Sequence, residues 1–380
     1  MTSRKKIIRI STIPTSLNVF CKDLLKDLSA DYDVVAVSSP GKPLDQLEKR
    51  EGVRTIAVPM ERRMSLFKDL KALISLVRVF RKERPDLVHS ITPKAGLLGM
   101  MAARLAGVKV RVHTFTGLVF PTATGLKRRI LKATDRMTCR CATHIIPEGE
   151  GVKRDLEKGR VTKKPMKILG FGNVRGIDLD WYARTPEVME KAGEFARKDV
   201  FTFIFIGRIA KDKGVEELVA AFLKLLGDRK DVRLLLAGEW EFTDPVSPQT
   251  ESFLKNTEEI NWVGSVPDVR PYLAASDCLV LPSYREGFPN SVIEAGALGL
   301  PCVVTDINGA NEIIAEGENG LIVPAKDSAS LYSAMKLIAE DKELYSKLKE
   351  AARPMVASRY ERGFVWSCLK AFYKEALKDV

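Results

Sequence analysis

The sequence predicts two doubly wound α/β domains in tandem. The chain has 380 residues, which is long for one domain, and 45% of them are hydrophobic, enough to bury two cores. Short apolar runs alternate with amphipathic stretches from end to end. Because parallel strands are covered by helices on both faces, they appear as continuous apolar runs separated by helices. This alternation therefore predicts two parallel sheets.

The strand candidates of the first half are short, rich in Val and Ile, and bounded by Gly, Pro or Asp. They are Lys6–Ser11, Asp33–Ser38, Arg54–Val58, Asp86–Ile91, Lys109–Phe115, Thr143–Pro147 and Met166–Gly170. Helical patterns lie between them. One has apolar residues at spacings of three and four, which predicts an amphipathic helix. These residues are Leu66, Leu70, Leu73, Ile74, Val77 and Phe80.

The second half repeats this pattern, with strand candidates at Phe201–Ile206, Val232–Ala237, Asn261–Val263, Cys278–Pro282, Cys302–Thr305 and Leu321–Val323. The glycine-rich segment Gly170–Asp178 is typical of an interdomain connection. An aromatic-rich helix is expected over Glu361–Leu377, crossing back to the first domain. The predicted domains are thus 1–172 and 173–360, followed by the terminal helix 361–380.

A glycine turn follows the strand FTFIFI and precedes a helix that begins near Val215. It places Gly207 and Arg208 before Lys213 and Gly214. Backbone N–H groups and cations gathered at such a turn suit a diphosphate. The alternative is an ordinary strand-to-helix turn with solvated lysines.

The segment Glu286–Glu294 follows the buried strand CLVLPS. Two glutamates eight positions apart bracket a Gly/Pro loop that opens a helix, with Asn290 or Ser291 as the expected N-cap and Glu294 on the first turn. The two carboxylates can accept hydroxyls from the hexose and the ribose of a sugar nucleotide, with the helix N-terminus toward the phosphates. Alternatively, Glu294 only complements the helix dipole and Glu286 is a surface residue.

The segment SDCLVLPSYREGFPNSVIEAGALGLPCVVTDINGANEII closely resembles the donor-binding core of the retaining glycosyltransferases of family 4, which have the GT-B fold. The hallmark E-x7-E of that family is matched by Glu286 and Glu294, and its Arg and Lys pair by Arg208 and Lys213 in GRIAKDKG. The resemblance covers nearly the whole chain. It implies two facing Rossmann-like domains, with the donor held mainly by the second.

The resemblance also implies roles for individual residues. Glu286, Arg208 and Lys213 would be catalytic, with Glu286 on the donor sugar and the two cations offsetting the charge of the diphosphate leaving group. Glu294 would bind the ribose, and Val266 lies in the stretch that matches the nucleobase pocket. The other expected donor-binding residues are Gly207, Gly287, Phe288, Pro289, Asn290 and Ser291. Such transfer generally needs no metal, and a UDP-sugar is the expected donor.

The sequence departs from the family pattern at two places. Many members carry a Gly-Gly pair in the first strand-to-helix loop, where this chain has Thr15 and Ser16 after a proline. Many also carry a histidine at the position of Thr116 in the segment VHTFTG. His113, three residues earlier, is therefore a separate candidate, and its alternative role is that of a strand-end histidine bonded to the backbone.

The N-terminal half most resembles a subgroup that extends lipid-linked saccharides for bacterial capsule, O-antigen or exopolysaccharide. The matching stretches are STIPTSLNVF, HSITPKAGLLG and HTFTGL. This resemblance implies an acceptor on a polyprenyl diphosphate, and Lys94 in TPKAG is placed to meet that diphosphate. Thr15, Ser16, His113 and Thr116 complete the candidate acceptor residues.

The net charge of +12 favours an anionic partner. A basic stripe, made of Arg128, Lys132, Arg136 and Arg140, recurs every four residues on a predicted helix. It can lie on anionic lipid, although a solvated face is the alternative. We see no secretory signal and no apolar stretch of about 18 residues, so we expect a cytoplasmic protein peripherally bound to the inner face of the plasma membrane.

A metal site is not expected. The six cysteines form no CxxC pair and are expected to be reduced thiols, and the three histidines have no zinc-ligand spacing. The DxD spellings at Asp31–Asp33 and Asp178–Asp180 lie outside any loop that would aim both carboxylates at one ion.

Two other functions remain as alternatives. A sugar-nucleotide epimerase of the same architecture would bind the donor but leave the basic N-terminal stripe unexplained. Nucleic-acid binding fits the charge, but no basic groove with interleaved aromatic residues supports it.

Overall fold

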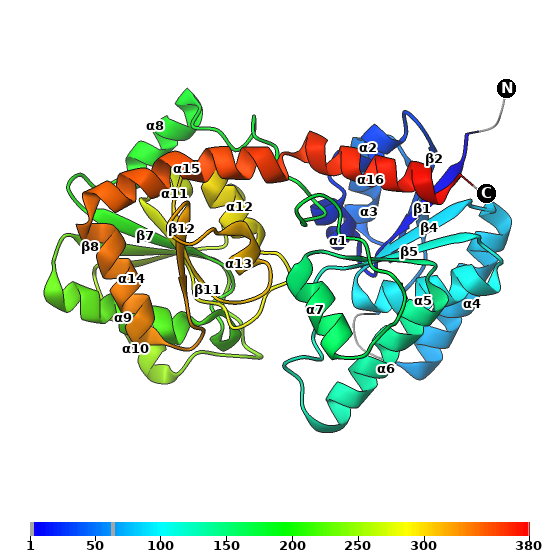
Figure 1. Cartoon of the computed structure of the whole chain (residues 1–380), viewed down its shortest axis with the longest axis horizontal. Coiled ribbons are helices and arrows are strands. Elements are labelled where there is room, and N and C mark those ends of the chain that lie inside the picture. The colour runs from blue at the N-terminus through cyan, green and yellow to red at the C-terminus, as the bar shows by residue number, and fades with distance from the viewer. Residues whose placement is uncertain (1–3, 62–64, 379) are drawn as a thin grey trace. The chain divides into compact units, whose positions relative to one another are not determined.

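The computed structural model describes residues 4–61, 65–378 and 380. The chain divides into two units, one of residues 1–176 with 363–380 and one of residues 177–362 (Figure 1). Each unit has a six-stranded sheet in which all strand pairs are parallel. In both units helices cover the two faces of the sheet (Figure 1), as the continuous apolar strands predict.

The sheet of the first unit has the order β3-β2-β1-β4-β5-β6, the doubly wound order with a switch point between β1 and β4. Its strands are β1 Lys6–Ile10, β2 Asp33–Ser38, β3 Arg54–Ala57, β4 Leu87–Ile91, β5 Val110–Phe115 and β6 His144–Pro147. Its helices are α1 Pro14–Phe20, α2 Leu24–Leu28, α3 Lys42–Glu51, α4 Leu66–Glu83, α5 Pro93–Leu105, α6 Gly125–Cys141, α7 Glu150–Lys158 and the terminal α16 Arg362–Ala376.

Alternate residues of β1 serve the two cores of this unit. Ile8 and Ile10 join the core beneath α4, α5 and α6, and Ile7 joins the core that includes α1, α2 and α16. The aromatic-rich terminal helix supplies Phe372 and Tyr373 to that second core. The terminal helix is therefore a structural part of the first unit.

Tyr373 also closes a buried polar network. Arg9 on β1 donates to the Tyr373 hydroxyl at 2.7 Å and lies 2.8 Å from Nδ1 of His89. The same hydroxyl is 2.6 Å from that Nδ1, and Nε2 of His89 is 2.7 Å from the Thr114 hydroxyl. Burial, and then the charge of Arg9, hold the pKa of His89 well below its usual value, so the imidazole is neutral.

The second unit has the strand order β12-β11-β10-β7-β8-β9. Its strands are β7 Phe201–Ile206, β8 Val232–Ala237, β9 Ile260–Gly264, β10 Cys278–Leu281, β11 Cys302–Thr305 and β12 Gly320–Val323. The helical elements are α8 Pro186–Phe195, η1 Lys211–Lys213, α9 Val215–Asp228, α10 Pro248–Asn256, α11 Arg270–Ala274, α12 Asn290–Ala297, α13 Ala310–Ile313, α14 Ser328–Glu340 and α15 Lys342–Tyr360. The switch point lies between β7 and β10.

One predicted strand is wrong. Met166–Gly170 forms only an isolated bridge between Met166 and Ile145. The chain then turns away because Gly170 and Gly172 have positive φ angles of 56° and 88°. An apolar run with strand-like composition thus lacks the continuous pairing that makes a strand.

The predicted face of α4 is also only partly buried. Phe80 is in the core, but Leu66, Leu70 and Ile74 are exposed, and Leu66 and its neighbour Phe67 have about nine-tenths of their surface in solvent. The N-terminal half of the stripe is therefore not covered by the residues that the structure describes.

Candidate active site

The loop after β7 positions both predicted cations. Gly207 and Arg208 follow the strand directly, and Lys213 lies in η1, one residue before Gly214. Gly214 has a φ of +69°, and a Cβ there would lie 2.0 Å from the carbonyl oxygen of Pro282. Only glycine permits this close approach, so the loop of β7 is held against the loop that follows β10.

This approach brings Lys213 to Glu286. The Nζ of Lys213 lies 2.6 Å from Oε1 of Glu286, and the Ser283 hydroxyl donates to the same oxygen at 2.9 Å. Both charged side chains are largely buried, with 16% and 18% of their surfaces exposed. Two of the three predicted catalytic residues are therefore in direct contact at the carboxyl ends of β7 and β10.

Arg208, the third, lies in the same loop but is more exposed. Its guanidinium pairs with Glu241 in the loop after β8 and lies 3.8 Å from Asp212. The Thr243 hydroxyl and backbone N–H, followed by Arg208, lower the pKa of Glu241 to about 2. Glu241 is therefore an anion beside the cation that is expected to meet the donor diphosphate.

The helix α12 begins one or two residues earlier than the sequence indicates. Its N-cap is Pro289, without a side-chain cap, so Asn290 and Ser291 lie inside the helix rather than capping it. Glu294 is the fifth helical residue, past the first turn, and its Oε1 accepts a hydrogen bond from the Tyr182 hydroxyl at 2.8 Å. Pro289 at the end of the loop has an extended conformation, with φ restricted by its ring, and takes the N-cap position in place of Asn290 or Ser291.

Two of the remaining donor candidates, Gly287 and Phe288, lie in the loop before α12. Gly287 is half-buried and is approached closely by Gly309, where a Cβ would lie 2.3 Å from its carbonyl oxygen. Phe288 is a core residue, with its ring 5.6 Å from that of Tyr360, so only its backbone faces the loop. Val266 lies apart, half-buried in the loop after β9.

In the first unit, three acceptor candidates lie at the starts of helices. Thr15 and Ser16 occupy the first turn of α1, after Pro14, and Thr15 is exposed. Lys94 is in the first turn of α5, and its Nζ is 2.7 Å from Asp69 of α4. Its charge is therefore already paired within the protein.

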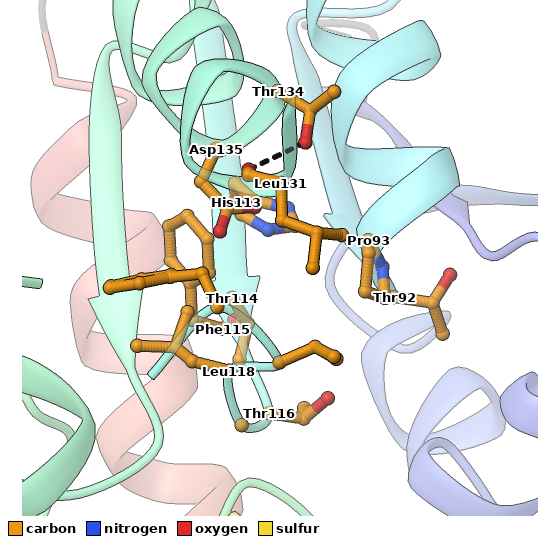
Figure 2. A pocket seen from close by; sticks show the side chains of 13 residues that line it. Thr92, Pro93, His113, Thr114, Phe115, Thr116, Leu118, Leu131, Thr134 and Asp135 are labelled. Atoms are coloured by element: carbon orange, nitrogen blue, oxygen red, sulfur yellow. Dashed lines mark hydrogen bonds between the residues drawn. The ribbon is translucent and has the colours of Figure 1, made fainter. Parts of the chain in front are cut away.

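The other two acceptor candidates share one cavity of about 40 Å³ at the carboxyl end of β5 (Figure 2). The Nδ1 of His113 is 2.8 Å from the Ser90 hydroxyl, and burial lowers the pKa of His113 to about 3, so it stays neutral. Its ring packs so closely on α5 that a Cβ at Gly96 would lie 2.3 Å from it. Thr116 lines the same cavity, beside Leu118.

Sequence reasoning missed several partners of these residues. Tyr182 binds Glu294, Ser283 binds Glu286 and Glu241 pairs with Arg208. A signal existed for Glu241, because it follows the carboxyl end of a predicted strand, where ligands bind in such sheets. Tyr182 lies in an irregular segment with no pattern.

The acidic DxD spellings have structural partners. Asp178 accepts hydrogen bonds from the backbone N–H groups of Asp180 and Trp181 and pairs with Arg362 at 2.8 Å. In the first unit, Asp33 pairs with Lys6 at 3.3 Å. These carboxylates serve a turn and a strand end.

Two protein families match the chain, one in each unit. "Glycosyl transferase 4-like domain" matches residues 17–172, and "Glycosyl transferases group 1" matches residues 189–355. The second match contains all three predicted catalytic residues. Because both families are transferases, they favour that function over the epimerase.

Relatives match along the whole length. The chain is 30% identical over 376 residues to the capsular polysaccharide biosynthesis glycosyltransferase CapM of Staphylococcus aureus, covering 99% of this chain and 98% of that one. It is 30% identical over 371 residues to the Escherichia coli UDP-Gal:alpha-D-GlcNAc-diphosphoundecaprenol alpha-1,3-galactosyltransferase, covering 93% of each. The fold matches that of Anabaena HepE, crystallised with UDP-glucose, with a TM-score of 0.81 and 17% identity over 97% of this chain and 99% of that one. The chain therefore belongs to the group 1 glycosyltransferases and is a glycosyltransferase with the GT-B fold.

Proposed function

We propose that this transferase moves a hexose or N-acetylhexosamine from a UDP-sugar to a saccharide on a polyprenyl diphosphate, with retention of configuration, in capsule, O-antigen or exopolysaccharide synthesis. The names of two relatives support the pathway and the acceptor, since one makes capsule and the other acts on a diphosphoundecaprenol saccharide. The UDP of the donor is supported by the ligand of HepE and by the name of the Escherichia coli relative.

The observation that carries the donor half is the contact between Lys213 and Glu286 beside α12. In the proposed reaction an acceptor hydroxyl attacks the anomeric carbon on the face from which UDP departs. The bond from that carbon to the β-phosphate oxygen breaks, and a β-phosphate oxygen takes the hydroxyl proton. Arg208 and Lys213 stabilise the charge that develops on the leaving group, without a metal. Glu286 holds the sugar and Glu294 the ribose.

A donor screen tests this assignment. Thermal shift with UDP-, GDP- and ADP-sugars identifies the donor, and transfer to a lipid-diphosphate saccharide is followed by chromatography, with the new anomeric centre assigned by NMR. We expect Lys213→Ala and Glu286→Ala each to lower turnover by about 10²-fold or more, the scale of one lost electrostatic group. The exposed Lys347→Ala serves as control. Unchanged turnover in both site variants, or an inverted product, contradicts the proposal.

We also propose that the chain works at the inner face of the plasma membrane, held by the basic stripe. In the structure Arg128, Arg136 and Arg140 are exposed and Lys132 is half-buried. Exposed apolar side chains accompany the stripe, with Leu126 at 70% and Ile130 at 38%. α4, with its uncovered N-terminal half, packs on the other side of α5 in the same layer (Figure 1).

No helix in the described ranges is long and apolar enough to span a bilayer. The proposed attachment is therefore a surface contact, in which apolar side chains enter the headgroup region and cations meet anionic lipid.

Vesicle sedimentation tests the membrane contact. Each cation near an anionic surface contributes about 1 kcal/mol, so replacing Arg128, Lys132 and Arg136 by alanine should weaken partitioning to phosphatidylglycerol vesicles by roughly 10²-fold. The control replaces the exposed Lys198 and Lys347 of the second unit. Equal weakening of vesicle binding in both variants would show that the net charge of the protein, and not the basic stripe, drives the binding.

A further inference from the structure

The cavity that contains His113 and Thr116 also contains a carboxyl group from α6. Asp135 lines it together with apolar side chains, among them Phe115, Leu118 and Leu131 (Figure 2). The walls come from the loop after β4, the end of β5, the segment that follows it and α6. Asp135 lies one turn beyond Leu131 on that helix, so its carboxyl group closes a pocket that is otherwise mostly apolar.

Most polar groups of this cavity are already bound within the protein. The Thr134 hydroxyl donates to the carbonyl oxygen of Leu131 at 2.7 Å, and that of Thr114 lies 2.7 Å from His89. By contrast, Asp135 makes no hydrogen bond or ion pair to any residue that the structure describes. A half-buried carboxyl group without a hydrogen-bond partner costs free energy of folding. Such groups are found where a ligand supplies the missing hydrogen-bond donor.

Among the residues that the structure describes, none supplies a charge that lowers the pKa of Asp135. Burial raises the pKa of Asp135 to about 7. His113 on β5 is neutral, and burial raises the pKa of Cys139, one turn further on α6, to about 12. Lys164 donates to the backbone carbonyl of Cys139 at 2.8 Å, and Lys132, one turn before Asp135, has its pKa lowered by desolvation and by the neighbouring arginines. Asp135 is thus poised between its two protonation states at neutral pH.

We propose that Asp135 binds the acceptor saccharide, by accepting a hydrogen bond from a hydroxyl or amide N–H group of the sugar. This inference rests on the proposed function and adds a recognition residue to it. The apolar walls suit the C–H groups that adjoin such a substituent. Since a cavity needs roughly 10–15 Å³ of such volume to hold one water, 40 Å³ holds about three waters, which matches one substituent rather than a whole saccharide.

The same chemistry excludes the acceptor diphosphate from this cavity. None of the described residues that line it is a lysine or arginine, and a carboxylate repels a phosphate. The cavity therefore distinguishes the sugar part of the acceptor from its anionic part.

A dependence of acceptor binding on pH follows. A hydrogen bond donated by the acceptor sugar favours the ionised carboxylate of Asp135. The affinity for the acceptor therefore rises with pH until Asp135 is fully ionised in the free enzyme. If only the ionised form binds, a group with a pKa of about 7 makes the acceptor KM about tenfold higher at pH 6 than at pH 8. The KM of the UDP-sugar should not follow this profile, because its predicted contacts lie in the second unit.

The test measures kcat and both KM values of the full-length enzyme from pH 6 to pH 8, for the wild type, Asp135→Asn, Asp135→Glu and the exposed Asp45→Asn. We expect Asp135→Asn to raise the acceptor KM at pH 8 by about tenfold or more and to abolish its pH dependence, leaving the donor KM unchanged. Asp135→Glu should restore part of the pH dependence, and Asp45→Asn should match the wild type.

A wild-type acceptor KM and pH profile in Asp135→Asn overturns the inference. Should that variant fail to fold, the wild-type profile decides, since an acceptor KM that is constant from pH 6 to pH 8 also overturns it. A wild-type enzyme that transfers to no lipid-diphosphate saccharide contradicts the proposed function instead, so the two failures are distinguishable.

Discussion

Replacing Tyr373 with phenylalanine tests how firmly the terminal helix is bound to the first unit. The substitution keeps the ring in its core and removes only the hydroxyl. That hydroxyl accepts a hydrogen bond from Arg9 at 2.7 Å and lies 2.6 Å from Nδ1 of His89. Arg9 is 3% exposed, and its Nε already has no hydrogen-bond partner among the described residues. The variant would leave a buried cation with one donor fewer satisfied.

The magnitude follows from these contacts. A hydrogen bond to a charged group contributes about 1.5–3 kcal/mol, and the contact with His89 is lost as well. We therefore expect the first unit to lose about 2–4 kcal/mol of stability. Because the ring remains, no change in apolar burial offsets or adds to this loss.

Hydrogen–deuterium exchange of the β1 amides measures the loss within the intact chain, so unfolding of the second unit does not confuse it. A loss of 2–4 kcal/mol accelerates exchange by about 30- to 1,000-fold, since 1.4 kcal/mol is a factor of ten. The matched control is Tyr32→Phe, whose ring packs edge-on to Tyr373 at 6.2 Å but whose hydroxyl has no hydrogen bond to a described residue. Equal exchange in the two variants would refute the reasoning.

Two further predictions concern the donor loops. Glu241→Gln removes the anion paired with Arg208, which competes with the UDP diphosphate for that cation. We therefore expect calorimetry to show UDP binding about two- to fivefold more tightly, the range set by the free energy of an exposed ion pair. Weaker UDP binding in this variant would contradict the idea that Glu241 competes with UDP for Arg208. Gly214→Ala forces a side chain against the backbone of Pro282, at a residue with a positive φ. We therefore expect the free energy of unfolding of the second unit, measured in urea, to fall by about 2–4 kcal/mol, and UDP to bind more weakly. An unchanged stability and an unchanged UDP affinity would show that the loop adapts to the side chain.

The sequence was a good guide to the sheets because most strands are buried and therefore appear as short, largely apolar runs. β2, β7, β8 and β11 have the predicted bounds, and the others differ by one or two residues. Met166–Gly170 misled because strand composition does not reveal whether a neighbouring strand is available. The periodicity of Leu66–Phe80 correctly predicted a helix, although helical periodicity defines a face and not what covers it.

The site was predictable where chemistry is carried by a local motif. Glu286 and Lys213 are 73 residues apart, yet both lie at strand ends, and parallel strands bring such ends to one edge. Asp135 was not predictable in this way. It lies within the basic stripe of α6, where a lone carboxylate looks like a solvated residue, and only its burial against β5 distinguishes it.

The membership of α16 in the first unit has a consequence for biosynthesis. The first unit emerges first from the ribosome but lacks α16 until residues 177–362 have been made, which takes roughly 10–40 s at a synthesis rate of about 5–20 residues per second. Throughout that time one face of its sheet has no Phe372 or Tyr373 to cover it. A chaperone that binds apolar surface has this interval in which to act, and a premature stop late in the chain would damage the earliest-made unit rather than the latest.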